Sequence, residues 1–149
     1  MSKTDYTKEL EVNTKPHLVF KAITCQIDKW WTIHSNKAAS LNDNLTVKFG
    51  ETTIKEMKIT EVKENESLVW EVTKAHIDIK ELSKKDEWVG TKIKWTISPT
   101  ESGSKISFIH QGLTPLFECY DACEGGWNYF LDSLKSFLNT GKGTPHGVD

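Results

Sequence analysis

Apolar and polar residues alternate along most of the middle of this chain. Apolar side chains recur at every second position in five successive sets: Leu45/Val47/Phe49, Met57/Ile59, Leu68/Trp70/Val72, Ile93/Trp95/Ile97 and Ile106/Phe108/His110. A period of two places such residues on one face of a strand, so each set predicts a strand with a buried face. A similar stretch at residues 6–12 predicts an earlier strand. Turn-forming residues at 50–52, 63–66 and 99–103 separate the later strands.

Two short helices are predicted after the first strand, and one long helix at the C-terminal end. Residues 16–23 predict a helix capped by Thr14, and residues 28–31 predict the second. Thr114, followed by a proline, predicts the start of a helix of about 25 residues that ends at Gly141. Its apolar residues follow the spacing of one buried face: Tyr120, Cys123, Trp127, Phe130, Leu131, Leu134 and Leu138.

This order of elements predicts an α+β domain, because no crossover helices separate the later strands as a parallel sheet requires. We expect a single domain over residues 1–149, with a curved antiparallel sheet of about six strands wrapped around the long helix. Bulky rings on both the sheet and the helix favour a gap between them. That gap is the predicted pocket, with an expected volume of roughly 300 Å³ or more. The long connection at residues 74–87 is placed to cover its opening.

The candidate ligand-binding residues are mostly aromatic. The chain holds six Trp, six Phe and three Tyr, an unusual share of large rings. The predicted pocket wall consists of Trp31, Trp70, Trp95, Phe108, Trp127 and Phe130, together with Thr91, His110 and Cys123. Such rings, with a few polar groups, are typical of a site for an apolar small molecule. A packed core made of the same rings is the alternative, and alternation does not distinguish the two.

His110 is the best polar candidate for chemistry in this set. It lies two residues after Phe108, on the same face of the strand, so its imidazole is expected to point inward. An unperturbed histidine pKa of about 6.5 suits a proton shuttle or a hydrogen bond to a ligand. The alternative is a core histidine bonded to a backbone carbonyl. No carboxylate partner is visible, since Glu71 has outward parity. On the binding hypothesis, His110→Ala alters ligand binding more than stability. Thr91 either adds a hydroxyl to the cavity or is an ordinary strand residue.

The three cysteines predict no disulfide framework. Cys25, Cys119 and Cys123 form no CxxC pair and are odd in number, which favours reduced thiols in a cytoplasmic protein. Cys119 and Cys123 lie one helical turn apart and suggest a soft-metal site or a redox pair. Structural zinc requires four ligands, however, and buried helical cysteines are commonly small apolar residues. We therefore predict no metal and no cofactor.

Composition argues against nucleic acid and membranes as partners. All 19 basic residues are lysine, so the arginine fork that reads guanine edges is absent, and the formal net charge is −2 with both signs interspersed. No segment approaches the roughly 18 apolar residues of a membrane-spanning helix, and the N-terminus has no apolar signal region. We expect a cytoplasmic monomer with no nucleic-acid partner and no membrane insertion.

Five stretches of the chain resemble a known family. They are Trp30-Trp31 and residues 87–95 (EWVGTKIKW), 118–127 (ECYDACEGGW), 133–135 (SLK) and 140–145 (TGKGTP). In these stretches the chain is similar to START-like (SRPBCC) proteins, and more narrowly to bacterial homologues of the activator of the heat-shock-protein-ninety ATPase. The resemblance implies a helix-grip fold with a deep cavity between sheet and helix. It also implies a superfamily that holds carriers, cyclases and cochaperone modules.

This fold supports three functional hypotheses, because one scaffold hosts many activities. The first is a binding or carrier protein for a hydrophobic small molecule, lipid-like or aromatic, in the cavity. The second is a cyclase- or hydrolase-like enzyme that uses His110 as acid or base. The third is a chaperone-interacting module, although the eukaryotic activator joins such a domain to a separate N-terminal chaperone-binding domain that these residues do not contain.

Overall fold

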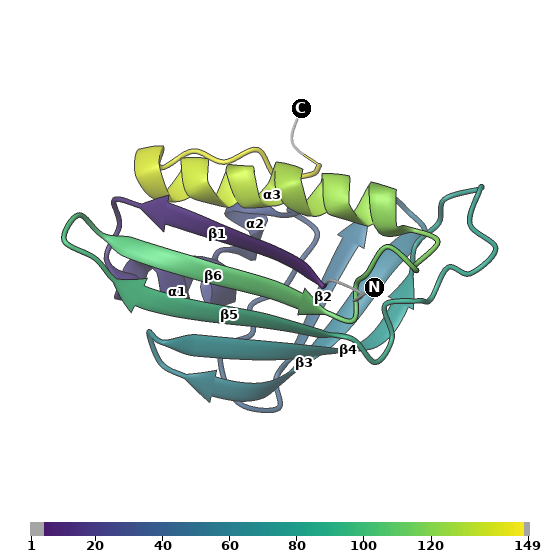
Figure 1. Ribbon diagram of the computed structural model, residues 1–149, viewed down its shortest axis with the longest axis horizontal. Coiled ribbons are helices and arrows are strands. Elements are labelled where there is room, and N and C mark those ends of the chain that lie inside the picture. The colour runs from purple at the N-terminus through teal and green to yellow at the C-terminus, as the bar shows by residue number, and fades with distance from the viewer. Residues whose placement is uncertain (1–4, 148–149) are drawn as a thin grey trace.

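Figure 1 shows a curved antiparallel sheet with the long C-terminal helix lying along it. The computed structural model describes residues 5–147. The strands are β1 (Tyr6–Val12), β2 (Asn44–Phe49), β3 (Thr53–Lys63), β4 (Ser67–His76), β5 (Lys92–Pro99) and β6 (Ser104–Gln111), in the sheet order β1-β6-β5-β4-β3-β2. The helices are α1 (Pro16–Cys25), α2 (Ile27–Trp30) and α3 (Tyr120–Thr140). This arrangement confirms the predicted α+β helix-grip fold.

The sheet is a meander whose first strand returns to its last. Strands β2 to β6 pair with their neighbours in sequence, and β1 pairs antiparallel with β6, with Leu10 opposite Ile106. The β3–β4 pairing shifts register twice, after Glu56 and after Ile59. Irregularities of this kind increase the local bend and twist of a sheet. They fit the curvature that brings the sheet around α3 (Figure 1).

The inner face of the sheet and the helices share one hydrophobic core. Every residue of the five alternating sets is buried except Phe49, which is partly buried. On α3, the buried apolar residues are Cys123, Trp127, Leu131 and Leu134. The periodicity of the sequence therefore predicted correctly which faces meet.

The helix α3 begins later than predicted. Thr114 lies in a segment of turns, and the first helical residue is Tyr120. Within the described residues, no side chain caps the first turn of α3. The segment just before it is held by a distant loop, because the Glu87 carboxylate accepts the N–H groups of Glu118 at 3.2 Å and Cys119 at 3.3 Å. A carboxylate at this position satisfies N–H groups that have no partner within the helix. The local signal at Thr114 therefore predicted the wrong starting residue.

The other helix boundaries agree with the sequence in part. The helix α3 ends as predicted at Gly141, which has a left-handed φ of 86° and donates its N–H to the Phe137 carbonyl at 2.7 Å. Thr14 does not cap α1, whose N-cap residue is Lys15. Instead, the Thr14 hydroxyl donates to the Leu138 carbonyl at 2.6 Å and ties the start of α1 to the end of α3. This tertiary contact replaces the predicted local one.

Candidate functional site

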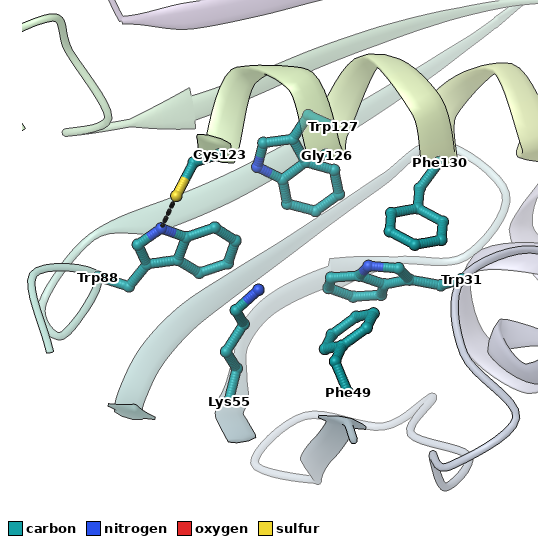
Figure 2. A pocket seen from close by; sticks show the side chains of 8 residues that line it. All are labelled: Trp31, Phe49, Lys55, Trp88, Cys123, Gly126, Trp127 and Phe130. Carbon is teal, nitrogen blue, oxygen red and sulfur yellow. Dashed lines mark hydrogen bonds between the residues drawn. The ribbon is translucent and has the colours of Figure 1, made fainter. Parts of the chain in front are cut away.

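A small pocket lies between the sheet and the first half of α3 (Figure 2). Its wall consists of Trp31, Phe49, Lys55, Trp88, Cys123, Gly126, Trp127 and Phe130. The volume is about 90 Å³. The predicted cavity of roughly 300 Å³ is therefore not found in this conformation. The space present admits a small group rather than a whole drug-sized ligand.

Several elements far apart in sequence supply this wall. Trp31 follows α2 directly, Phe49 ends β2, Lys55 lies in β3, and Trp88 lies in the loop between β4 and β5. The helix α3 supplies the other four residues at positions 123, 126, 127 and 130. That spacing places them on one face of a helix. Figure 2 shows the side chains from the sheet, the loop and the helix pointing toward a common space.

Four of the nine predicted site residues line the pocket: Trp31, Cys123, Trp127 and Phe130. Trp70, Trp95 and Phe108 are buried in the core. Trp31 stacks on Trp70 with 5.9 Å between ring centroids, and Trp70 meets Trp95 edge to face at 5.6 Å. Rings thus fill much of the space that a wide cavity would occupy. Among residues 5–147, the buried indole N–H groups of Trp70 and Trp95 have no hydrogen-bond acceptor.

Thr91 and His110 do not line the pocket; both are buried, and His110 links Thr91 to Trp127. The Trp127 indole N–H donates to Nδ1 of His110 at 3.0 Å, and Nε2 of His110 lies 2.8 Å from the Thr91 hydroxyl. Because that hydroxyl donates to the Trp88 carbonyl at 2.6 Å, its oxygen accepts a hydrogen bond from the Nε2–H group of His110. Burial, and then the charge of Lys55, lower the pKa of His110 to about 3. Both ring nitrogens are thus occupied, which favours a structural histidine.

Lys55 places an ammonium group within the aromatic wall. Lys55 pairs with the buried Val47 of β2 and shares the inward parity of Met57. Its Nζ atom lies 4.1 Å from the Trp88 ring centroid and 4.7 Å from that of Phe49. Desolvation lowers the pKa of Lys55 to about 8. No carboxylate between residues 5 and 147 forms a salt bridge with it. The ammonium remains charged at neutral pH, and the two ring faces offset part of its desolvation.

Two thiols meet where α3 begins. The Sγ atoms of Cys119 and Cys123 are 2.8 Å apart, and the Trp88 indole N–H donates to Cys123 Sγ at 3.2 Å (Figure 2). The S–H···S contact with Cys119 lowers the pKa of Cys123, and the Trp88 N–H and the charge of Lys55 act in the same direction. The same S–H···S bond raises the pKa of Cys119. Of the two thiols, Cys123 is the one on the pocket wall.

Sequence reasoning missed four residues of the wall: Phe49, Lys55, Trp88 and Gly126. Phe49 belongs to an inward set, and Lys55 shares the parity of Met57, so alternation contained a signal for both. Trp88 lies in a loop, where parity has no meaning. The Gly125-Gly126 pair inside a helix predicts a kink or a close approach of the backbone to the sheet or a ligand beside the cavity, but only the structure shows that Gly126 faces the pocket.

Neither a metal cluster nor a membrane span is found in the part of the chain that the structure describes. Across residues 5–147, no three metal-ligating side chains are grouped closely enough to hold an ion. The helices of the same range are too short or too polar to cross a bilayer.

Comparison with known sequences gives one family. The family model described as Activator of Hsp90 ATPase homolog 1-like protein matches residues 13–139. No curated protein matches the chain significantly. The match covers the chain from the start of α1 nearly to the end of α3, and so includes every residue of the pocket wall.

Solved structures of similar fold cover nearly the whole chain. The solution structure of the Aha1 dimer from Colwellia psychrerythraea is 22% identical, with a TM-score of 0.76, and covers 94% of this chain and 99% of its own. Protein MLL2253 from Mesorhizobium loti is 15% identical, with a TM-score of 0.73 and coverage of 91% and 96%. Protein SSP2350 from Staphylococcus saprophyticus is 18% identical, with a TM-score of 0.68 and coverage of 95% and 96%. At these identities the likeness shows the fold.

Proposed function

The chain belongs to the family of Activator of Hsp90 ATPase homolog 1-like proteins, and we propose that it binds a small apolar molecule bearing an acidic group in the pocket beneath α3. The supporting observation is the Lys55 ammonium inside an aromatic wall. Family membership is consistent with a ligand-binding or a chaperone-associated module. The chaperone-associated hypothesis rests on the family description alone, whereas the binding hypothesis also has a site.

An ammonium at this position costs the fold free energy. Burial favours the neutral amine, as the lowered pKa of Lys55 shows. Methionine would fill the same space with no charge to desolvate. The two ring faces of Phe49 and Trp88 offset part of the cost but do not supply an anion. An acidic ligand would supply it, because a carboxylate within this wall pairs with the ammonium in a medium of low dielectric.

The size of the pocket restricts the ligand. A volume of about 90 Å³ is well below the roughly 300–1,000 Å³ of a site for a drug-sized molecule. A single aromatic ring or the end of a short alkyl chain is the appropriate scale. A wider lipid-like ligand requires a ring to move, and the partly buried Phe130 at the pocket wall is the best placed to do so.

The enzyme hypothesis has less support from the geometry. Its acid or base would be His110, which is fully hydrogen-bonded to Trp127 and Thr91 and does not line the pocket. A general acid or base must reach the reacting proton directly or through one water. The contacts of His110 leave no nitrogen free for that purpose.

Matched pairs of acids and alcohols test the proposal. Phenylacetate is compared with 2-phenylethanol, and hexanoate with hexanol, by thermal unfolding and by calorimetric titration. The variants are Lys55→Met and, as control, Lys58→Met, which changes an exposed lysine on the other face of β3. We expect the acids to stabilise the wild type more than the alcohols do, as binding to the native state requires.

Loss of the charge should remove that preference for acids. We expect Lys55→Met to weaken binding of the acids about tenfold or more, which corresponds to about 1.4 kcal/mol, and to leave binding of the alcohols nearly unchanged. Lys58→Met should bind like the wild type. Equal affinity for acid and alcohol in the wild type, or unchanged acid binding by Lys55→Met, would overturn the proposal.

A further inference from the structure

The contact between Cys119 and Cys123 has a geometry that suits a covalent bond. Both thiols are buried, with exposed fractions of 2% and 8%, and their sulfurs are 2.8 Å apart. The Cys123 N–H donates to the Cys119 carbonyl at 2.8 Å, so one helical turn separates the two residues. Helix dimensions then give a Cα separation of about 6.2 Å. Disulfides span Cα separations of roughly 4.4–6.8 Å, which includes this one. The Cβ atoms one helical turn apart are roughly 5–6 Å apart, wider than the roughly 3.5–4.5 Å of a disulfide, so bond formation requires a shift of Cys119, the N-cap residue that precedes α3.

The two thiols differ in access to the pocket and in their hydrogen-bond partners. Cys123 lies on the pocket wall, whereas Cys119 is not part of it. The Cys123 sulfur accepts the Trp88 indole N–H at 3.2 Å and lies 2.8 Å from the Cys119 sulfur. Figure 2 shows Lys55 extending toward the same end of the pocket. Hydrogen-bond donors and a nearby positive charge favour a thiolate, which is the reactive form of cysteine.

We infer that Cys119 and Cys123 are a hydroperoxide-sensitive dithiol, in which Cys123 reacts first and Cys119 then closes a disulfide. The inference is independent of the proposed binding function, since it needs no ligand. The oxidant is a small hydroperoxide, because the pocket of about 90 Å³ admits a group of that size beside Cys123. Cys25 lies in α1 and takes no part.

The reaction is balanced as two steps. The Cys123 thiolate attacks the outer oxygen of the hydroperoxide; an S–O bond forms, the O–O bond breaks, and the departing oxygen takes the thiol proton and leaves as an alcohol or water. The sulfur is oxidised to sulfenic acid as the peroxide is reduced. The Cys119 sulfur then attacks the Cys123 sulfur. An S–S bond forms, the S–O bond breaks, and the hydroxyl leaves as water with the Cys119 proton.

Intact-mass measurement after hydrogen peroxide treatment tests this inference. The background is Cys25→Ser, which leaves only the pair. We expect the protein to lose two hydrogen atoms, to show no free thiol at position 119 or 123 after peptide mapping, and to return to its original mass with dithiothreitol. In the same background, Cys119→Ala should leave a sulfenic acid at Cys123 that dimedone traps. Cys123→Ala should react at least about tenfold more slowly, because its remaining thiol, Cys119, does not line the pocket.

Two results would overturn the inference. One is a protein with both thiols whose mass increases by oxygen atoms after peroxide treatment, or does not change, instead of decreasing by two hydrogen atoms. The other is an equal rate of oxidation in the two alanine variants, which would mean that Cys123 has no priority. Because Cys25→Ser retains both thiols, its mass change is decisive even if an alanine at either position prevents folding. Failure here leaves the binding proposal intact, since the acid and alcohol titrations do not depend on oxidation.

Discussion

Lys55 links the stability of the fold to pH. Its pKa in the folded state is about 8, below the value of about 10.4 expected for an unfolded chain. The unfolded state therefore binds the proton more tightly. The whole destabilising contribution of the charge is present below pH 8. That cost disappears as the pH rises through the interval up to about 10.4. We predict that Lys55→Met raises the free energy of unfolding by about 1–3 kcal/mol at pH 7, and that this gain shrinks above pH 8.

Urea unfolding at a series of pH values checks this prediction, with Lys58→Met as the control. The control changes a lysine on the exposed face of β3, so it should alter stability by no more than about 0.5 kcal/mol. A stabilised variant that no longer prefers acids would show that Lys55 serves binding rather than folding. A destabilised Lys55→Met would instead mean that the ammonium supports the fold.

His110 requires the opposite prediction from the one based on sequence alone. His110→Ala leaves the Trp127 N–H and the Thr91 hydroxyl without their shared partner, so we expect a loss of about 2–4 kcal/mol of stability and little change in phenylacetate binding. Ile109→Ala, which changes an outward neighbour, is the control. Chemical unfolding and calorimetry measure the two effects. Normal stability combined with lost phenylacetate binding would mean that His110 belongs to the ligand site.

The pKa of His110 also has a consequence in acid. The folded-state value is about 3, below the value of about 6.5 expected when unfolded. The neutral ring therefore contributes fully to stability above pH 6.5, and the contribution is lost as the pH falls from 6.5 toward 3. His110→Ala should flatten the stability curve in that window. An unchanged acid dependence would mean that other groups control it.

At the scale of elements, the sequence predicted the strands well and the start of α3 poorly. Strands such as β1 follow from alternation, because a buried face imposes a period of two wherever a sheet covers a core. The start of α3 depends on Glu87, which lies about thirty residues earlier and reaches the N–H groups of Glu118 and Cys119. In return, the Glu118 carboxylate accepts the N–H groups of Ser83 and Lys84. A local cap signal cannot reveal such a long-range contact.

The glycine pair in α3 offers a test at this scale. A Cβ atom at Gly125 or Gly126 would meet no atom within 4 Å, so neither glycine is required by close packing. Alanine should therefore stabilise the helix by about 0.5–1 kcal/mol at either position. Only Gly126 lines the pocket. We predict that Gly126→Ala raises stability but weakens phenylacetate binding several-fold.

Gly125→Ala is the matched control, since its position is exposed. It should raise the melting temperature by a similar amount and bind phenylacetate like the wild type. Thermal unfolding and titration of the two variants measure both effects. Equal binding by both variants would show that the ligand does not occupy the pocket next to Gly126.

For the whole molecule, the fold was predictable from the sequence and the size of the cavity was not. Parity identifies the residues that face inward, but it does not say whether rings such as Trp31, Trp70 and Trp95 pack against one another or stand apart around a space. Here they pack, and a pocket of about 90 Å³ remains. The expected monomer stays a prediction. The relative from Colwellia psychrerythraea is described as a dimer, so sedimentation of this chain is the appropriate measurement.

A crystal structure of the protein soaked with phenylacetate tests the central claim most directly. The concentration should be the one that half-saturates the titration, so that occupancy reflects the measured affinity. We predict that the aromatic ring lies between Trp127 and Phe130, with a carboxylate oxygen roughly 2.7–3.2 Å from Nζ of Lys55. Density for phenylacetate elsewhere, or in the pocket with its carboxylate turned away from Lys55, would contradict the account.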